Sequence, residues 1–267
     1  MTLGAAPTLP ALPSSLDAEL RGAVAVLTLD RPAKRNALSD EMIGGIEAFF
    51  LGLPASVAAV VIAAAGDHFS AGLDLSEMSE RSTFDGMVHS RMWHRVFELV
   101  ESGPVPVVAA LKGAVVGGGL ELAAAAHIRV AERSTFYALP EGQRGIFVGG
   151  GAAVRVPRLM GTARMIDLIL TGRRLDAEEG AAAGLSQYVV DDGTGREEAL
   201  ALAERIAQNA PQTNYAVVQA LPRIAEANPR EGYLMEAMMA AITQGTDDAK
   251  ARMQAFLDGR AAKVTDR

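Results

Sequence analysis

Two glutamates stand next to glycine clusters in otherwise apolar surroundings. Glu121 lies within GGGLELAAAA (117–126), and Glu141 lies within LPEGQRG (139–145). Three consecutive glycines let the backbone approach a ligand closely and adopt angles that residues with a Cβ avoid. A helix that starts at this triplet would present free N–H groups and a partial positive charge to an anion, or to an oxygen that becomes one during a reaction. Two carboxyl groups near such a site could act as acid and base on one substrate.

Each glutamate also has a purely structural interpretation. Glu121 would lie in the first turn of the expected helix, where a carboxylate caps free N–H groups and is favoured by the helix dipole. Glu141 could be a polar residue of a Pro–Glu–Gly turn. The sequence alone does not establish whether the two carboxyl groups meet in space, so both interpretations stay open at this point.

Several other kinds of site are disfavoured. A dinucleotide pattern GxGxxG starting at Gly117 or Gly149 would need glycine where Leu122 and Val154 stand, and no GK[ST] triplet of a phosphate loop occurs. The absence of cysteine excludes disulfides, thiolate metal sites and a cysteine nucleophile. The four histidines are scattered, and His89 and His94 are not spaced as an i, i+4 pair, so no metal site is expected.

The length and composition suit one large α/β domain, or one domain with a helical extension. The chain has 267 residues, of which 49% are hydrophobic, and a formal net charge of −7. Without a stripe of Lys and Arg, neither nucleic acid nor an anionic membrane is expected as a partner. Residues 1–15 contain no basic residue and several prolines, so we expect a disordered lead rather than a targeting segment. No apolar run is long enough to span a bilayer, and a cytoplasmic location is expected.

The order of elements predicts an alternating β/α region over 16–195 and a helical region over 196–267. Apolar runs predict strands and amphipathic runs predict helices, with Ser39 as a plausible N-cap. The expected strands are 16–20, 23–29, 57–65, 105–111, 127–131, 135–138 and 188–190. The expected helices begin at about residue 39 and include 84–100, 120–126, 152–159, 163–170, 177–183, 197–208, 214–227, 232–243 and 247–257.

Several ordered motifs resemble the crotonase, or enoyl-CoA hydratase/isomerase, superfamily over about Leu16–Arg260. The segments that carry the resemblance are LDRPAKRNAL (29–38), FSAGLDL (69–75), KGAVVGGGLELA (112–123) with HIRVA (127–131), LPEGQRGIFVGGGAAVRVPRLMG (139–161) and TGRRLDAEEGAAAGLSQYVV (171–190). The resemblance implies an α/β fold made of a spiral of ββα units, followed by helices that build a trimer, often stacked into a hexamer. It also implies an acyl-CoA thioester as substrate, with coenzyme A as part of the substrate and no separate cofactor or metal.

The resemblance further implies a role for each residue of the reacting centre. Glu121 would be the base that activates water for addition at Cβ, and Glu141 would supply the proton to Cα. The backbone N–H groups of Leu73 and Gly118 would form the oxyanion hole for the thioester oxygen. This agrees with the independent expectation that Gly118 begins a helix.

The same resemblance implies the residues that contact coenzyme A and the acyl group. The residues expected to bind substrate are Arg31, Lys34, Ala37, Ala71, Gly72, Asp74 and Gly117, with Phe256 and Lys263 reaching a neighbouring subunit's site. Arg35 is a further candidate for a phosphate, although solvated loop charges explain these basic residues equally well. Met78, Phe84, Met87 and Trp93 fall where the family lines its acyl pocket, and core packing is an equal alternative for most of them.

The sequence departs from the family pattern at two positions and leaves three functions open. Val148 stands where the family commonly has proline, and Arg144 is a charge in a segment that is usually more apolar. Having both glutamates favours a hydratase. The alternatives are double-bond isomerisation or an aromatic acyl-CoA hydratase/lyase reaction on the same scaffold, and a non-catalytic protein that binds acyl-CoA.

Overall fold

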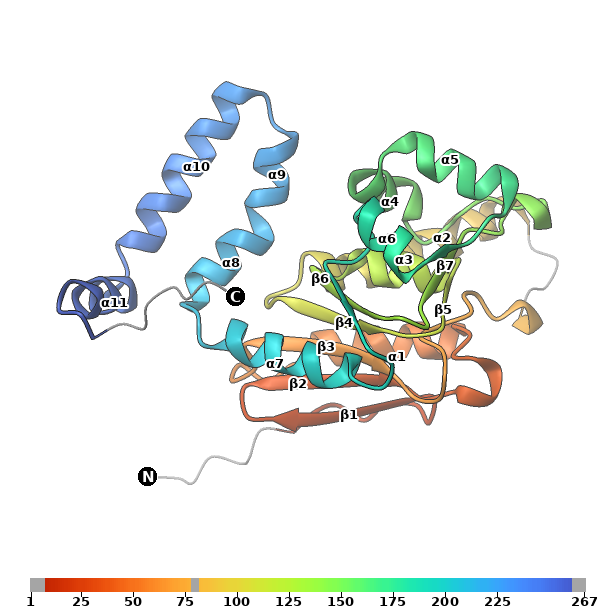
Figure 1. Ribbon diagram of the computed structural model, residues 1–267, viewed down its shortest axis with the longest axis horizontal. Coiled ribbons are helices and arrows are strands. Elements are labelled where there is room, and N and C mark those ends of the chain that lie inside the picture. Colours follow the sequence, from red (N-terminus) through yellow and green to blue (C-terminus); the bar gives the residue numbers. More distant parts are fainter. Residues whose placement is uncertain (1–7, 78–81, 261–267) are drawn as a thin grey trace. The chain divides into compact units, whose positions relative to one another are not determined.

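The computed structural model describes residues 8–77 and 82–260, and the chain divides into two compact units, Met1–Ala207 and Gln208–Arg267. The first unit contains two β-sheets (Figure 1). The larger sheet has the order β1 (Leu16–Arg21), β2 (Val24–Leu29), β3 (Ala59–Ala64), β4 (Val107–Leu111), β6 (Ile128–Glu132) and β9 (Tyr188–Val190). The smaller sheet has the order β5 (Ala114–Val116), β7 (Phe136–Ala138) and β8 (Leu175–Asp176).

The larger sheet is parallel apart from its first strand, and both of its faces are covered. β1 pairs with β2 in an antiparallel arrangement, as the neighbouring runs 16–20 and 23–29 predict. Side chains alternate between two packed layers, so that Val26 faces the layer that contains α7 and Leu27 faces the main core. Burial on both faces explains why β2, β3 and β4 read as continuous apolar runs.

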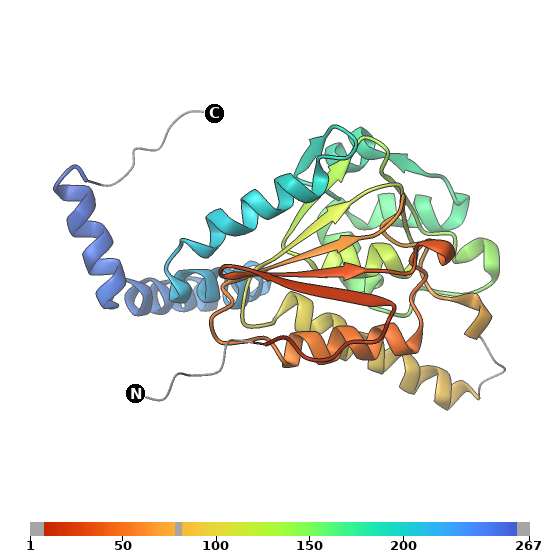
Figure 2. The same cartoon turned by 90° about the horizontal axis from the view of Figure 1, so that it is seen from below.

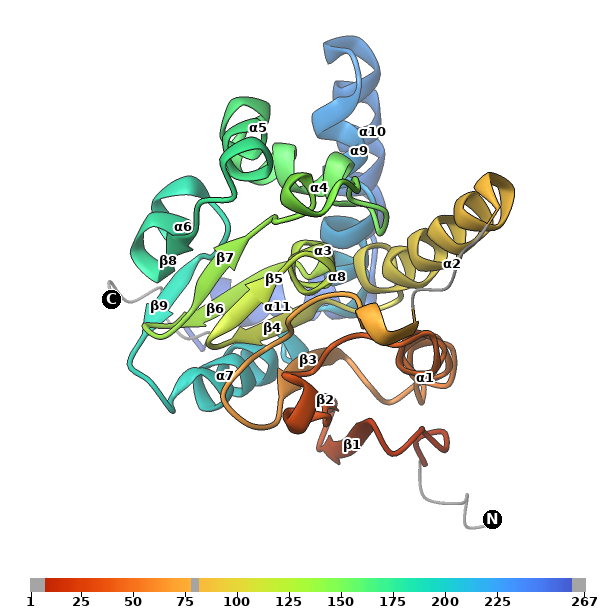
Figure 3. The same ribbon diagram turned by 90° about the vertical axis from the view of Figure 1, so that its right-hand side faces the viewer.

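Consecutive strands pass from the larger sheet to the smaller one. Only Lys112 and Gly113 separate β4 from β5, and β6 leads into β7 after a turn at 133–135. β5 is then followed directly by α3, which gives a ββα order in this part of the chain. The first unit is therefore a mixed α/β structure, as expected, and Figure 3 shows α3 enclosed among the surrounding elements.

Seven α-helices and three short 3-10 helices are described in the first unit. Their bounds are α1 (Asp40–Leu51), α2 (Thr83–Glu101), α3 (Gly118–Ala125), α4 (Ala152–Met160), α5 (Thr162–Thr171), α6 (Ala177–Ala183), α7 (Gly195–Ala207), η1 (Pro32–Lys34), η2 (Leu75–Glu77) and η3 (Gly142–Arg144). The expected cap of α1 is confirmed, because the Ser39 side chain accepts a hydrogen bond from Met42 N. The first unit extends one helix beyond the expected boundary at residue 195, because α7 packs against β2, β3, β4 and β6.

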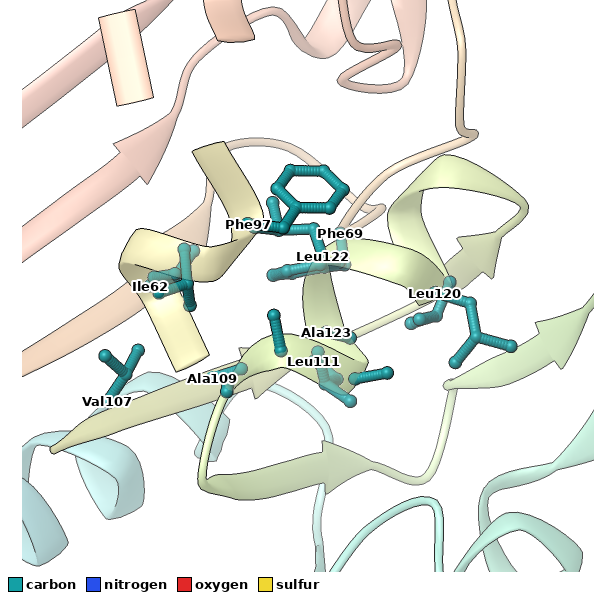
Figure 4. Packing of buried hydrophobic residues seen from close by; sticks show 14 of the residues in the cluster. Ile62, Phe69, Phe97, Val107, Ala109, Leu111, Leu120, Leu122 and Ala123 are labelled. Atoms are coloured by element: carbon teal, nitrogen blue, oxygen red, sulfur yellow. The ribbon is translucent and has the colours of Figure 1, made fainter. Parts of the chain in front are cut away.

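The helix that begins at the glycine triplet is the centre of the core. All eight residues of α3 are buried, and Figure 4 shows Leu122 and Ala123 close to Phe69 and to side chains of β4. Helices α2 and α4 both pack against α3. The position of Glu121 on α3 is therefore fixed by packing on several sides.

The described part of the expected disordered lead is ordered. Leu9 and Leu12 pack against the main core, and Ser15 is buried, with its carbonyl accepting a hydrogen bond from Asp30 N. The expectation for residues 1–15 is therefore wrong over the stretch 9–15. Pro13 lies against Gly45 of α1 and Pro10 lies against Gly52 at the end of that helix, so this stretch gains contacts that compensate for its ordering. Residues 1–7 lie outside the described residues.

Helices alone build the described part of the second unit. They are α8 (Pro211–Gln219), α9 (Leu221–Glu226), α10 (Pro229–Gln244) and α11 (Asp247–Leu257), and α10 packs against α8 and α9 (blue in Figure 1). The single helix expected over 214–227 is two helices, because Pro222 has no N–H to continue the hydrogen-bond ladder. Among the described helices, none is both long and apolar enough to cross a membrane.

Candidate active site

A cavity of about 420 Å³ brings the two predicted catalytic glutamates together. Its wall includes both carboxylate residues and five other predicted residues, namely Ala71, Gly72, Leu73, Gly117 and Gly118. The remainder of the wall comes from the start of α1, from η2, from α2, and from η3 with the segment that connects it to α4. These elements lie around α3 in the first unit, and Figure 2 shows α1 and α2 on one side of the larger sheet.

Glu121 is buried in the wall and is solvated by backbone groups of another helix. Its Oε1 accepts hydrogen bonds from Gly150 N at 2.8 Å and from Ala152 N at 3.1 Å. Glu121 lies in the first turn of α3, as the structural interpretation expects, but the donors to its side chain, Gly150 N and Ala152 N, lie outside its own helix, so the capping part of that interpretation is not supported. Burial raises the pKa of Glu121, and the N–H groups of Ala152 and Gly150 oppose that rise because they stabilise the charged form.

Glu141 is also buried, but its hydrogen bonds and neighbouring charges differ from those of Glu121. It lies in the expected turn with Pro140, but its side chain is only 8% exposed. Among the described residues, its Oε2 has no hydrogen-bond partner. Burial raises the pKa of Glu141 and the charge of Glu121 raises it further, while its own backbone N–H and the charge of Arg144 oppose the rise. The N–H donors at Glu121 thus favour a carboxylate there, whereas the neighbouring Glu121 charge favours the protonated form of Glu141.

Gly117 and Gly118 form the turn from β5 into α3. Gly117 has φ of 52° and ψ of −120°, a conformation that residues with a Cβ rarely adopt. A Cβ added there would lie 2.7 Å from Glu141 Oε1. Gly118 is the first residue of α3, where the N–H has no acceptor within the helix. The glycine at 117 thus leaves room for Glu141, and among the described residues no acceptor is assigned to the Gly118 N–H at the cavity wall.

The segment 69–75 places the Leu73 N–H beside Gly118. A Cβ added to Gly118 would lie 3.3 Å from Leu73 N, and one added to Gly72 would lie 3.1 Å from Gly118 N. Among the described residues, no acceptor is assigned to the Leu73 N–H. The two predicted oxyanion-hole residues are therefore neighbours, while their role toward a substrate oxygen stays a prediction.

Backbone bridges hold this segment against two other parts of the chain. Leu38 N donates to Gly72 O at 2.8 Å, and Asp74 N donates to Leu38 O at 2.9 Å. On the other side, Ser70 forms a parallel bridge with Val115 of β5. These bonds fix the loop that carries Leu73 to the strand that leads into α3.

Asn36 is a structural residue of this region that was not singled out from the sequence. Its backbone has φ of 52°, and its buried side chain donates to Ala65 O at 2.9 Å and to His68 O at 2.7 Å. Its carbonyl accepts a hydrogen bond from Ser70 Oγ. Asparagine tolerates the left-handed region better than most residues, and this tolerance was the available signal.

Trp93 and a histidine–aspartate pair also lie in the cavity wall. Trp93, on α2, is 4% exposed and packs against Gly118 and Gly150. His89 Nε2 lies 2.6 Å from Asp40 Oδ1, and both residues line the cavity. This pair was not predicted, because it joins two helices that are far apart in the sequence. Arg144 and Val148, the two departures from the family pattern, line the same cavity.

The basic residues predicted to contact coenzyme A lie beside the cavity. Arg31 Nη1 donates to Asp74 Oδ2 at 2.7 Å and to Ala37 O at 3.1 Å. Hydrogen bonds from Ser76 and the Arg31 charge lower the pKa of Asp74 to about 2. Lys34 Nζ lies 3.9 Å from the same carboxylate, and Arg35 is exposed. Arg31 and Asp74 therefore brace the loop, while their contact with substrate stays a prediction.

The remaining predicted residues lie on surfaces or outside the described residues. Phe84 and Met87 are 66% and 55% exposed on α2 and are not among the described residues that line the cavity. Phe256 is exposed on α11 in the second unit. Met78 and Lys263 lie outside the described residues.

Comparisons with known proteins identify the family of this chain. The family described as "Enoyl-CoA hydratase/isomerase" matches residues 19–267. The chain is 34% identical over 241 residues to a Bacillus subtilis protein named "Probable enoyl-CoA hydratase", covering 89% of this chain and 93% of the relative. It is 33% identical over 250 residues to the "Short-chain-enoyl-CoA hydratase" of Clostridium acetobutylicum, and this match covers 91% of this chain and 94% of the relative.

A solved structure has the same fold over nearly the whole chain. It is named "putative enoyl-CoA hydratase" and comes from Rhodopseudomonas palustris. The identity is 57%, the TM-score is 0.92, and the match covers 97% of this chain and 100% of the other. The chain therefore belongs to the enoyl-CoA hydratase/isomerase family, that is, to the crotonase superfamily.

Proposed function

We propose that this chain is an enoyl-CoA hydratase, which adds water across the 2,3 double bond of an enoyl-CoA thioester. The observation that carries the proposal is that Glu121 and Glu141 line one cavity in different hydrogen-bonding environments. Two carboxyl groups whose surroundings favour different protonation states can divide the roles of base and acid. The free N–H groups of Leu73 and Gly118 supply the third requirement, a site for a developing oxyanion.

In this mechanism, Glu121 is ionised and Glu141 is protonated before the reaction. The Glu121 carboxylate removes a proton from a water molecule as the water oxygen forms a bond to Cβ. The π electrons of the double bond move toward the thioester oxygen, and the Leu73 and Gly118 N–H groups stabilise the charge that develops there. The carboxyl group of Glu141 then donates its proton to Cα, which gives the 3-hydroxyacyl thioester.

Coenzyme A is part of the substrate in this proposal, and no separate cofactor takes part. We propose that the loop with Arg31, Lys34, Arg35 and Ala37 contacts the coenzyme A portion, because it lies next to the segment that carries Leu73. Ala71, Gly72 and Gly117 would contact the thioester end, since they share the cavity wall with both glutamates.

We also propose that the second unit is covered by other copies of the chain in a trimer or a hexamer. Its described helices carry many large apolar side chains that are more than half exposed, namely Tyr215, Val217, Leu221, Tyr233, Leu234, Met238, Ile242, Met253, Phe256 and Leu257. An exposed apolar surface of this kind indicates an interaction site. Sedimentation that gives a stable monomer would contradict this part of the proposal.

Product analysis tests the proposed reaction. Purified protein is mixed with short-chain, long-chain and aryl 2-enoyl-CoA thioesters, and the loss of the conjugated-thioester absorbance is followed. We expect the product to be a 3-hydroxyacyl-CoA that contains one oxygen from solvent. A shifted double bond would indicate an isomerase, and cleavage to an aldehyde would indicate a hydratase/lyase. Tight binding of coenzyme A thioesters without any turnover would indicate a non-catalytic binding protein.

A further inference from the structure

We infer that Arg155 is a positioning residue, which holds the backbone donors of the 150–152 turn against the Glu121 carboxylate through an ion pair with Glu101. This inference rests on the proposed function of Glu121 as the base. Arg155 does not line the cavity among the described residues, so it would act through Glu121 rather than touch the substrate.

A continuous series of contacts connects Glu101 to Glu121. Glu101 Oε2 accepts from Arg155 Nε at 2.7 Å, and Arg155 Nη1 donates to Gly150 O at 3.2 Å. Gly150 N then donates to Glu121 Oε1 at 2.8 Å, and Ala152 N donates to the same oxygen at 3.1 Å. The guanidinium group of Arg155 therefore binds both the Glu101 carboxylate and the 150–152 turn, whose N–H groups donate to Glu121.

The bond from Arg155 is placed where it can control both donors. Gly150 O lies in the chain between Gly150 N and Ala152 N, the two groups that donate to Glu121. The turn is otherwise permissive, because Gly151 has φ of 110° and no side chain. A Cβ on Gly151 would lie 2.2 Å from Arg155 Nη1, so glycine at this position is what admits the guanidinium group.

The burial of Arg155 indicates that more than a surface ion pair is involved. Its side chain is 7% exposed, and that of Glu101 is 28% exposed. Removing such charges from water is costly, and a buried pair is weak evidence for added stability. Glu101 is also the last residue of α2, where the helix dipole disfavours a carboxylate. The arrangement is thus better explained by the position it gives to the turn than by its contribution to folding.

Arg155 also acts on Glu121 through its charge. Its positive charge lowers the pKa of Glu121, in the same direction as the Gly150 and Ala152 N–H groups. The other charged group that faces Glu121 in the cavity is Glu141, which in turn faces Arg144. His94 on α2 also interacts with the charge of Arg155. Loss of Arg155 should therefore raise the pKa of Glu121 while the neighbouring groups stay in place.

Four variants test the inference, and each changes one part of the series. Arg155→Gln removes the charge and shortens the side chain, whereas Arg155→Lys keeps the charge without the planar fork. Glu101→Gln keeps Arg155 but weakens its anchor. Arg158→Gln is the matched control, because Arg158 lies on the same helix, 3.8 Å from the other oxygen of Glu101, and is half exposed. For each variant, kcat, KM and the pH dependence of kcat/KM are measured.

For Arg155→Gln we expect kcat to fall about 10- to 100-fold, because small displacements of a catalytic group have effects of this size. KM should change less than about twofold, and the acidic limb of kcat/KM should move to higher pH. Arg155→Lys keeps the positive charge, so the acidic limb of kcat/KM should stay at its wild-type position. Only part of the wild-type kcat should remain. Glu101→Gln should lower kcat and raise the pKa of Glu121 by less than Arg155→Gln does, because Arg155 keeps its charge but loses its anchor while the N–H donors are held less firmly. Arg158→Gln should match the wild type.

A second readout separates this inference from the proposed function. The Glu121 carboxyl carbon is titrated by ¹³C NMR in protein labelled at glutamate, and its signal is assigned by its absence in Glu121→Gln. The pKa of Glu121 should rise in Arg155→Gln and not in Arg158→Gln, even if no enoyl-CoA is turned over. An unchanged pKa together with unchanged kcat in Arg155→Gln would overturn the inference. The same changes in Arg155→Gln and in the control Arg158→Gln would also overturn it. If Arg155→Gln does not fold, Glu101→Gln decides the question by the same two measurements: a lowered kcat with a raised pKa of Glu121 supports the inference, and wild-type values of both overturn it.

Discussion

Glu121 Oε1 accepts two backbone hydrogen bonds, whereas Oε2 of Glu141, in the wall of the same cavity, has no partner among the described residues. N–H donors stabilise a carboxylate, and burial beside another carboxylate, with one oxygen unpartnered, favours a carboxylic acid. This difference assigns Glu121 as the ionised base and Glu141 as the protonated acid in the proposed hydration. The predictions below follow from that assignment and from the glycines that make room for it.

The rate of hydration should depend on pH in a bell-shaped manner. Glu121 must be ionised, and its pKa is raised, so kcat/KM should fall as the pH decreases through a value above the ordinary 4.5. Glu141 must be protonated, so kcat/KM should fall again as the pH rises through its own raised pKa. Because the two groups interact, the two limbs belong to the pair. A rate that is constant from about pH 4 to pH 9 would contradict the assignment.

The variant Glu141→Gln should unfold less readily than the wild type at high pH. The folded-state pKa of Glu141 is raised, so its contribution to stability is present below the unfolded value of 4.5 and is lost as the pH rises through the folded pKa. Glutamine carries no charge to bury. Urea unfolding at pH 8 should therefore show a higher free energy of unfolding for the variant, and the difference should shrink at pH 5. A variant less stable than the wild type at pH 8 would contradict the burial argument.

The sequence predicted the site more fully than it predicted the contacts that hold the site. Both glutamates and both oxyanion-hole residues follow from local glycine-rich motifs and from the family resemblance, and the structure brings them to one cavity. The cap at Ser39 and the buried run of β2 are also local signals, and both are confirmed. Such features depend on residues that are adjacent in the chain.

The features that were missed depend on long-range contacts. Asn36 and the His89–Asp40 pair join segments that are far apart in the chain and are brought together by the fold. No local sequence pattern indicates that these segments are in contact. The strand β5 is three residues long and lies inside the glycine-rich stretch, so periodicity gives little signal there. The order at 9–15 likewise depends on packing against α1 and the core.

The substitution Gly117→Ala should lower both stability and activity. A Cβ at this position would be strained at φ of 52° and would lie 2.7 Å from Glu141 Oε1. Such strain costs about 1–3 kcal/mol, and the displaced carboxyl group should lower kcat. Gly44→Ala is the control, since a Cβ there meets nothing within 4 Å in the middle of α1. Alanine should stabilise that helix by up to about 1 kcal/mol. Equal behaviour of the two variants in urea unfolding and kcat would refute this account of Gly117.

The single tryptophan should report ligand binding directly. Trp93 is the only tryptophan of the chain, and its buried ring lies in the cavity wall next to Gly118. Titration with an acyl-CoA should therefore change the intrinsic fluorescence in a saturable manner and reduce its quenching by acrylamide. Free coenzyme A, which lacks the acyl group, is the comparison ligand. If calorimetry detects acyl-CoA binding while the fluorescence stays constant, the acyl group does not enter this cavity.

The most direct test of the two-carboxylate account compares Glu121→Gln and Glu141→Gln with the wild type on the enoyl-CoA that the wild type hydrates fastest. Removal of a general acid or base typically costs about 10²–10⁴ in rate, and glutamine keeps nearly the same shape. We predict a loss of kcat of this size in each variant, with acyl-CoA binding preserved in the fluorescence titration. Activity within tenfold of the wild type in either variant would contradict the account.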